Sequence, residues 1–480
     1  MSGTRVVILG GGPAGLGAAL ALARRGLAPT VVEAQGDVGG NAGGFTLHGI
    51  PVDYGSHRLH PATDPEILAE IRALLGDDLR ERPRHGRILL GGRWIHFPLR
   101  GLDVATGAPP AFALGVARDL AAKMVRGALG GGGASGRPDQ ETFASVLLRG
   151  LGPTVCHDFY FPYARKIWGL APDEISPVQA RKRVSSGSLG ALLKRVLPGG
   201  AGAGGRSGKG TFFYPRGGFG QISEALGAAA ASAGARVLLE TRVRGVKLGG
   251  ADALVEVEDG EGTRTLACDH VWSTIPMAVL ARITDPPPPA EVRHAVERLD
   301  QRSMVLAYLA LDQDRFTEYD AHYFPSADVP FTRLSEPKNY AGATEPRGRT
   351  VLCAEFPCST DDAAWTADDA TLSAMVVEGL ARAGLPVKSR VVEVTARRLP
   401  SAYPLYRLGY EAHFHRLDAW ISALPGVLSF GRQGLYAHDN THHALAMARA
   451  AVACLDDHGR FDTARWVAYR DVFATHVVED

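Results

Sequence analysis

Short apolar runs alternate with glycine-rich turns over the first 35 residues of the chain. Residues 5–9 read Arg-Val-Val-Ile-Leu and residues 30–33 read Thr-Val-Val-Glu, and both runs are typical of short buried strands. Between them, residues 14–25 are rich in alanine and leucine, which predicts a helix. A strand, a helix and a second strand in this order predict a βαβ unit with two parallel strands.

The pattern changes further along the chain. Helices are predicted over residues 111–129 and 140–170, and a helix followed by strands returns between residues 221 and 276. Residues 304–311 form a near-continuous apolar run, which predicts a strand of another sheet. An alanine-rich helix is predicted from residue 441 to residue 455. The chain therefore predicts an α/β protein in which a helical region separates two strand-rich regions.

The turn after the first strand carries the pattern G-x-G-x-x-G. Gly10 permits the tight turn, Gly12 lets backbone N–H groups approach a pyrophosphate, and Gly15 lets the helix pack closely on the strand. Glu33 ends the second strand, where its carboxylate can accept hydrogen bonds from a ribose hydroxyl. Alone, the pattern could be a simple glycine-rich turn, but in this context it predicts dinucleotide binding.

A second glycine-rich segment favours FAD over NAD as the dinucleotide. It begins Asp37-Val-Gly39-Gly40 and gives the backbone a second approach to the same cofactor, which NAD enzymes do not ordinarily need. Its continuation, Asn41-Ala-Gly-Gly, and the later Asp53-Tyr-Gly-Ser-His-Arg-Leu-His60 resemble the flavin amine oxidase clan. More narrowly, they resemble UDP-galactopyranose mutase and its protoporphyrinogen-oxidase-like relatives.

The resemblance implies a division of the chain and a set of cofactor contacts. It implies a discontinuous, Rossmann-like FAD-binding domain of the GR2 type at residues 1–100, 211–285 and 420–480. A helical insertion at residues 101–210 would cap the substrate, and residues 286–419 would form a mixed-sheet substrate domain. The residues expected to hold FAD are Gly10, Gly12, Pro13, Ala14, Gly15, Glu33, Ala34, Gly39, Gly40, Asn41, Gly55, Ser56, His57, Val243, Gly431, Arg432, Asn440 and Thr441.

The same resemblance implies a substrate cleft. The run at residues 159–169 is similar to a mutase segment in which aromatic residues end a helix, and residues 332–336 match the T-R-x-x-E pattern of the mutases. The residues expected to bind substrate are Tyr163, Trp168, Arg183, Arg333, Tyr403 and Tyr436. An aromatic stripe can equally be core packing, and charged residues on a strand can be a solvated face.

Two departures from the mutase pattern weaken the case for a UDP group on the substrate. An expected R-x-P-x-R run is present only as Arg181-Lys-Arg183-Val-Ser-Ser, without its proline or last arginine. An expected Tyr-Tyr-x-x-Asp run is replaced by Tyr436-Ala-His-Asp-Asn440.

Histidines supply the candidate acid and base groups. His57 and His60 follow the glycine segment, titrate near neutral pH and could handle the proton that accompanies flavin chemistry. With Arg333 and Tyr403 they form the expected catalytic set. His438 and His442 are one helical turn apart and could bind zinc, but no H-E-x-x-H pattern or third ligand accompanies them, so no metal is expected.

Composition limits the binding partners and the cell compartment that are expected for the protein. A net charge of +1, with 21% charged residues, gives no field that favours nucleic acid or an anionic membrane. Residues 6–23 carry no charge, yet they contain five glycines and a proline, so no integral membrane segment is expected. Five scattered cysteines match no zinc spacing and favour a reducing cytoplasm. The expected partner is a small-molecule substrate, and the oligomeric state stays open.

These features predict an FAD-dependent oxidoreductase. It would move a hydride from a hydroxylated or amino-bearing, sugar-like ring to flavin N5. Two alternatives remain open: a redox-neutral mutase that uses reduced flavin on a sugar nucleotide, and an oxidase of the protoporphyrinogen-oxidase or desaturase type.

Overall fold

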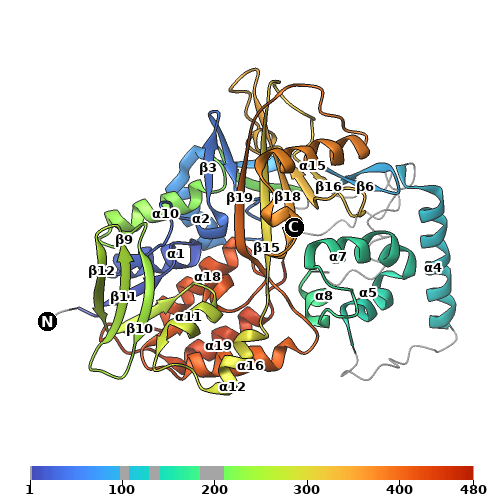
Figure 1. The fold of residues 1–480 in the computed structure, drawn as a ribbon. Coiled ribbons are helices and arrows are strands. Elements are labelled where there is room, and N and C mark those ends of the chain that lie inside the picture. Colours follow the sequence, from blue (N-terminus) through green and yellow to red (C-terminus); the bar gives the residue numbers. More distant parts are fainter. Residues whose placement is uncertain (1–2, 98–106, 129–140, 184–209, 479–480) are drawn as a thin grey trace.

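The computed structural model describes residues 3–97, 107–128, 141–183 and 210–478, and the predicted βαβ unit lies at the centre of a five-stranded parallel sheet (Figure 1). The strand order is β20-β13-β1-β2-β9. These strands are short and apolar because helices and a second sheet cover both faces. Their bounds are β1 (Val6–Leu9), β2 (Thr30–Val32), β9 (Arg236–Leu238), β13 (His270–Ser273) and β20 (Val427–Ser429).

Helices from three distant parts of the chain pack on one face of this sheet. Helix α1 contacts both α10 and α18, and their buried alanines and leucines form one apolar cluster with β1. Small residues on these helices let the backbones approach closely, which positions the N-termini of α1 and α18. The helices are α1 (Pro13–Arg24), α2 (Pro65–Leu75), α10 (Gln221–Ser232), α18 (Thr441–Ala453) and α19 (Thr463–Ala474).

A four-stranded sheet and three helices cover the other face. The sheet has the order β12-β11-β10-β14, and its valines pack with apolar residues of the helices in a second cluster. The strands are β10 (Arg242–Lys247), β11 (Ala253–Asp259), β12 (Gly262–Cys268) and β14 (Thr284–Asp285). The helices are α11 (Met277–Ile283), α12 (Ala290–Glu297) and α16 (Tyr410–Ser422).

A seven-stranded mixed sheet forms the second large part of the fold. Its order is β19-β15-β18-β17-β16-β6-β7, and every pair is antiparallel except β16 with β6. Helix α15 (Asp369–Arg382) packs on one face, and the hairpin of β3 (Gly44–Leu47) and β4 (Ile50–Asp53) packs on the other. The strands are β6 (Gly86–Leu90), β7 (Arg93–Phe97), β15 (Gln301–Leu311), β16 (Ala321–Tyr323), β17 (Arg333–Ser335), β18 (Thr350–Cys358) and β19 (Val391–Pro404).

Burial on both faces explains the apolar run in β15. Val305 and Leu309 point to the α15 side, whereas Leu306 and Tyr308 point to the β3–β4 hairpin, as the two-residue period of a strand requires. The hairpin belongs to the glycine-rich segment that was expected to hold FAD. The seven-stranded sheet therefore packs directly against the predicted cofactor loops.

The region predicted to be helical contains one long helix, α4, and several short helices, on the side of the molecule away from β10–β12 (Figure 1). The single helix expected over residues 140–170 is interrupted, because Gly152 has a φ of +85° and Pro153 follows it. A π-helical turn at Cys156–Tyr160 precedes the last helix of the run. The helices are α4 (Pro110–Ala128), α5 (Phe143–Leu151), α6 (Pro153–Val155), α7 (Phe161–Trp168) and α8 (Pro177–Arg183).

The α/β class with a Rossmann-like domain is confirmed. The three-part division stays a prediction, and the sheets do not follow its first boundary, because β6 and β7 come from the first 100 residues but pair in the seven-stranded sheet. All five cysteines are buried free thiols. In the described residues, no helix has both the length and the apolar character needed to span a membrane.

Candidate active site

One cavity of about 730 Å³ joins the glycine-rich turns to the predicted substrate residues. Its lining comes from the parallel sheet and its helices, from the seven-stranded sheet and from α7, so all three parts of the fold contribute. A cavity of this size is typical of a site for a cofactor or a drug-sized ligand.

The first glycine turn is shaped to receive a phosphate. Gly10 has a φ of +104°, which glycine adopts without strain. A Cβ on Gly15 would lie 2.1 Å from the Gly10 carbonyl oxygen, so only glycine fits where α1 crosses the turn. At Gly12, in contrast, the nearest heavy atom to a Cβ is Gly39 O at 3.9 Å. Gly12 therefore has open space beside it at the N-terminus of α1, where backbone N–H groups favour an anion.

The second glycine segment is fixed against the first. Gly39 N donates to Gly11 O at 2.8 Å, and Gly39 has a φ of +116°. The Glu33 carboxylate accepts from Gly11 N at 2.7 Å and from Gln35 N at 2.9 Å. A carboxylate has about four acceptor positions, so Glu33 retains capacity for a ribose hydroxyl at the cavity wall.

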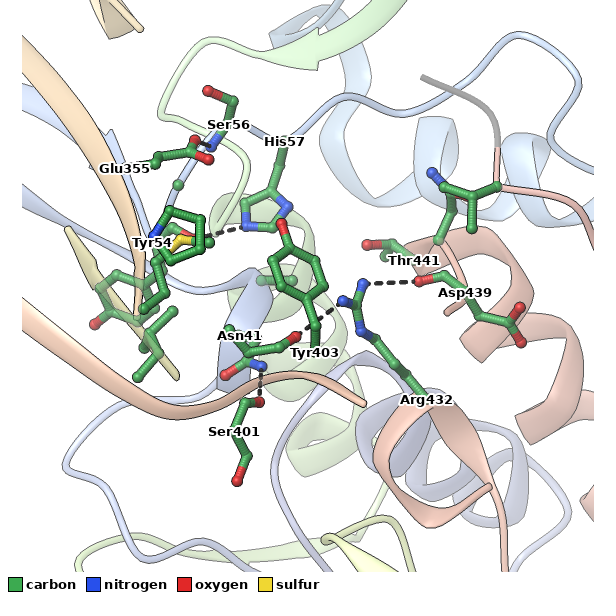
Figure 2. Close-up of a pocket in the computed structure, with 18 of the residues that line it drawn as sticks. Asn41, Tyr54, Ser56, His57, Glu355, Ser401, Tyr403, Arg432, Asp439 and Thr441 are labelled. Carbon is green, nitrogen blue, oxygen red and sulfur yellow. Dashed lines mark hydrogen bonds between the residues drawn. The ribbon is translucent and has the colours of Figure 1, made fainter. Parts of the chain in front are cut away.

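The last part of the chain closes the cofactor end of the cavity (Figure 2). Arg432 donates to Asp439 O at 3.0 Å and to Ala402 O at 2.9 Å, and Asn41 Nδ2 donates to Ser401 O at 2.9 Å. Asn440 caps α18, and its N-terminus faces the cavity through Asn440 and Thr441. The cavity thus offers a turn with open space for a phosphate, the Glu33 carboxylate as an acceptor for a ribose, and the N-terminus of α18. Together these three features fit FAD.

His57 lies on the cavity wall and is held from two sides. Its Nε2 lies 3.0 Å from Tyr54 O, and its ring stacks on Phe219 at 5.2 Å. Burial lowers the pKa of His57 to about 4, so the imidazole is neutral at pH 7, with Nε2–H donating to the carbonyl. A neutral His57 can fix the geometry of the loop, but it is a weak base.

Arg333 lies on the cavity wall but is already paired. Its Nε and Nη2 donate to the two oxygens of Glu355 at 2.9 Å each, and Nη2 also donates to Ser56 O at 3.4 Å. Burial works against the Arg333 charge, yet Glu355 keeps the pKa of Arg333 above its ordinary value. Because Glu355 compensates this charge, Arg333 is a weaker anchor for an anionic substrate than the sequence suggested.

Two aromatic side chains, Trp168 and Tyr403, line the cavity together. Trp168 ends α7 and Tyr403 lies on β19, and their rings meet edge to face at 5.5 Å. The His438 ring lies 4.9 Å from Trp168, and its Nε2 is 2.8 Å from Pro404 O. Trp168 is only 5% exposed, so it is both part of the core and part of the cavity wall.

The structure brings most of the predicted site residues together. The predicted residues that line the cavity are Gly10, Gly12, Pro13, Ala14, Glu33, Gly39, Gly40, Asn41, Gly55, Ser56, His57, His60, Tyr163, Trp168, Arg333, Tyr403, Arg432, Asn440 and Thr441. Their roles stay predictions.

Other predicted residues do not line the cavity. Gly15 and Gly431 pack beside it, against the Gly10 carbonyl and the Ala14 methyl group. Tyr436, expected to bind substrate, is 3% exposed, and its hydroxyl donates to Leu405 O at 3.0 Å within the core. Ala34 and Val243 also lie outside the lining. Arg183 ends α8, and its side chain lies outside the described residues.

Sequence reasoning missed two groups on the cavity wall. Glu355 sits in the otherwise apolar strand β18, and a lone buried acid in such a strand was a usable signal. Arg58, between the two predicted histidines, contacts Asp320 and lies over the Tyr340 ring. Its partners are more than 250 positions away in the chain, and no local pattern indicated them.

One cluster outside the predicted set has metal-ligand chemistry. Ligand atoms of Asp439, His443 and His476 lie within 4.8 Å of one another. However, the two imidazoles stack at 4.1 Å with 15° between their planes, so one ion cannot lie in both ring planes, where the nitrogen lone pairs point. In the pair His438 and His442, the Nε2 of His438 lies 2.8 Å from Pro404 O, so the hydrogen bond occupies that nitrogen. The expectation of no metal stays a prediction.

A parallel dinucleotide-binding sheet with a second glycine segment on its phosphate turn defines a flavoprotein. The model of the flavin containing amine oxidoreductase family matches residues 13–436, and the chain belongs to this family. The family confirms the predicted resemblance, FAD as the cofactor and the oxidoreductase class.

The chain is similar in sequence to the "Putative flavin-containing monoamine oxidase AofH" of Mycobacterium tuberculosis (strain CDC 1551 / Oshkosh), at 28% identity over 311 residues. The match covers 64% of this chain, and the chain spans 64% of the length of the curated relatives it matches. In fold it is similar to reduced UDP-galactopyranose mutase, with a TM-score of 0.77 and 19% identity over 94% of this chain and 93% of that chain. It is also similar to the "Putative protoporphyrinogen oxidase" from Exiguobacterium sp. 255-15, with a TM-score of 0.71 and 20% identity over 94% and 98% of the two chains.

Proposed function

We propose that the protein oxidises a small ring-bearing substrate that carries a hydroxyl or amino group, with FAD as the acceptor. The observation that carries this proposal is the cavity of about 730 Å³, in which the FAD turns and the Trp168–Tyr403 pair line a shared space. FAD held by the two glycine turns, Glu33 and the N-terminus of α18 would supply a two-electron acceptor at N5 for a hydride from a substrate carbon, and the proton of the hydroxyl or amino group would leave to a base or to water.

The residues of the chain supply binding, orientation and exclusion of water. Trp168 and Tyr403 offer an edge and a face to a ring substrate, which fixes its orientation. The walls of α7 and the seven-stranded sheet limit the access of water to the reacting atoms. Because burial lowers the pKa of His57, we propose that His57 orients the loop and that the substrate proton passes to solvent.

An anaerobic titration tests this proposal directly. Purified holoprotein is mixed with cyclic amines and hydroxylated rings, one at a time, while the flavin absorbance is recorded. Bleaching of the oxidised flavin band by one class, with an equal amount of oxidised product, is the expected result. If no such compound reduces the flavin, but enzyme reduced beforehand isomerises a sugar nucleotide with no net change in flavin, the protein is a mutase and the proposal is wrong.

A further inference from the structure

The carboxylate of Glu355 connects two walls of the cavity (Figure 2). It extends from β18 and is 2% exposed. Its Oε1 accepts from the backbone N–H of Ser56 at 2.8 Å and from Arg333 Nε at 2.9 Å, while Oε2 accepts from Arg333 Nη2 at 2.9 Å. Nη2 of the same arginine donates to Ser56 O at 3.4 Å. One ion pair of the seven-stranded sheet therefore holds both polar backbone atoms of Ser56.

The loop that this pair holds belongs to the cofactor side. Gly55 has a φ of +95°, and a Cβ there would lie 3.5 Å from Glu355 Oε1, so the loop turns tightly against the carboxylate. His57 follows at once and stacks on Phe219, which precedes α10 of the parallel-sheet part. The loop is thus fixed on one side by the seven-stranded sheet and on the other by the FAD-binding part.

The charge of Glu355 also matters for the cavity. The Arg333 side chain is 16% exposed and lines the same cavity, and Glu355 is its partner in the ion pair. Without the carboxylate, a nearly buried guanidinium would stand uncompensated beside the loop. Such a charge would favour the negatively charged, reduced form of a flavin placed there.

A second buried glutamate of the same region behaves differently. Glu336 accepts from Phe316 N at 2.8 Å, Thr317 N at 3.1 Å and Thr350 Oγ1 at 2.7 Å. It is 2% exposed, as Glu355 is, but it does not line the cavity. Its partners belong to the seven-stranded sheet and to loops beside it, so its role is confined to the stability of that part.

We propose that Glu355 is a positioning residue. Its carboxylate holds the flavin-facing loop Gly55–Ser56–His57 and the Arg333 guanidinium at fixed positions relative to each other. The inference rests on the proposed function only in placing the flavin ring beside this loop.

The test compares Glu355→Gln with the matched control Glu336→Gln. For each variant, FAD affinity is measured by titration of apoprotein, the reduction potential of bound FAD by equilibration with redox dyes, and the melting temperature of the apoprotein by calorimetry. Glu355→Gln should weaken FAD binding by about 10-fold, because a neutral amide oxygen holds Ser56 N and Arg333 less strongly than the carboxylate does, and should make the potential more positive. Glu336→Gln should lower the melting temperature and leave both flavin properties as in the wild type.

A double variant separates the charge effect from general damage. Adding Arg333→Gln to Glu355→Gln removes both charges, so the potential should return towards the wild-type value. If Glu355→Gln does not fold, Glu355→Asp takes its place, because it keeps the charge but withdraws it from Ser56 N, and it should weaken FAD binding with a smaller change in potential. A Glu355 variant that lowers only the melting temperature would overturn the proposal. None of these measurements needs turnover, so they stand even if the proposed oxidation is wrong.

Discussion

Replacing Gly12 by valine should remove FAD binding and leave the apoprotein folded. Gly12 has φ −78° and ψ 177°, an extended conformation that valine adopts readily. The nearest heavy atom to a Cβ at this position is Gly39 O at 3.9 Å, so the Cβ has open space on the cavity side. The valine side chain would occupy the space where a pyrophosphate approaches the N-terminus of α1.

The size of the effect follows from the contacts that a phosphate would lose. Two hydrogen bonds from backbone N–H groups to a charged phosphate contribute about 1.5–3 kcal/mol each, so losing both costs about 3–6 kcal/mol. At about 1.4 kcal/mol per factor of ten, FAD binding should weaken by about 10²–10⁴-fold. The apoprotein should change in stability by less than about 1 kcal/mol, because the backbone conformation already suits valine.

Gly15→Ala is the matched control for this prediction. Its Cβ would lie 2.1 Å from Gly10 O, so this smaller substitution should destabilise the apoprotein itself. FAD affinity by flavin fluorescence and apoprotein melting by calorimetry measure the two effects separately. If Gly12→Val binds FAD within threefold of the wild type, the cofactor phosphates do not approach this turn and the reasoning fails.

Three further outcomes follow from the structure. The pKa of His57 is lowered from 6.5 in the unfolded chain to about 4 in the folded protein, so between these pH values the unfolded chain binds a proton that the folded protein does not. The stability of the protein therefore falls as the pH drops through this range. His57→Asn should make the dependence of the melting temperature on pH shallower. Arg302→Ala removes the donors to Ile167 O, Ser359 Oγ and Pro357 O, so the free energy of unfolding in urea should fall by about 3 kcal/mol and tryptophan fluorescence should shift. An unchanged urea midpoint would show that these three hydrogen bonds do not stabilise the fold. Trp168→Phe should raise KM about 5-fold and leave the FAD content unchanged, as measured by steady-state kinetics on whichever substrate reduces the flavin. A KM equal to that of the wild type would show that Trp168 does not contact the substrate.

Most of the cofactor half of the site could be predicted from the sequence. The strand, turn, helix and acid of residues 5–33 form a local unit whose glycines have a fixed geometric purpose, and β1, α1 and β2 lie within a residue of their predicted positions. The helix after Asn440 was readable for the same reason, because its cap and its alanines are local signals.

The substrate half depends on contacts between distant residues. Glu355 gains its role from Ser56, 299 positions away, and no local pattern reports such a partner. Tyr436 was misplaced because an aromatic residue near a cofactor segment can turn either to the cavity or to the core, and here its hydroxyl finds backbone partners inside. The pairing of β6 with β16 likewise joins residues far apart in sequence, so the boundary at residue 100 that the resemblance implied could not foresee it.

The strand order of the parallel sheet has a consequence for how the protein is made. β1 (Val6–Leu9) leaves the ribosome long before one of its two neighbours, β13, which is built from residues 270–273, and before the outer strand β20, which ends at Ser429. Until those residues are synthesised, one edge of β1 stays unpaired, and an unpaired apolar edge invites association with other chains. The nascent chain therefore cannot capture FAD in a finished site before β20 and the N-terminus of α18, at Asn440 and Thr441, have been synthesised. A chaperone that shields β1 during synthesis would raise the yield of holoprotein.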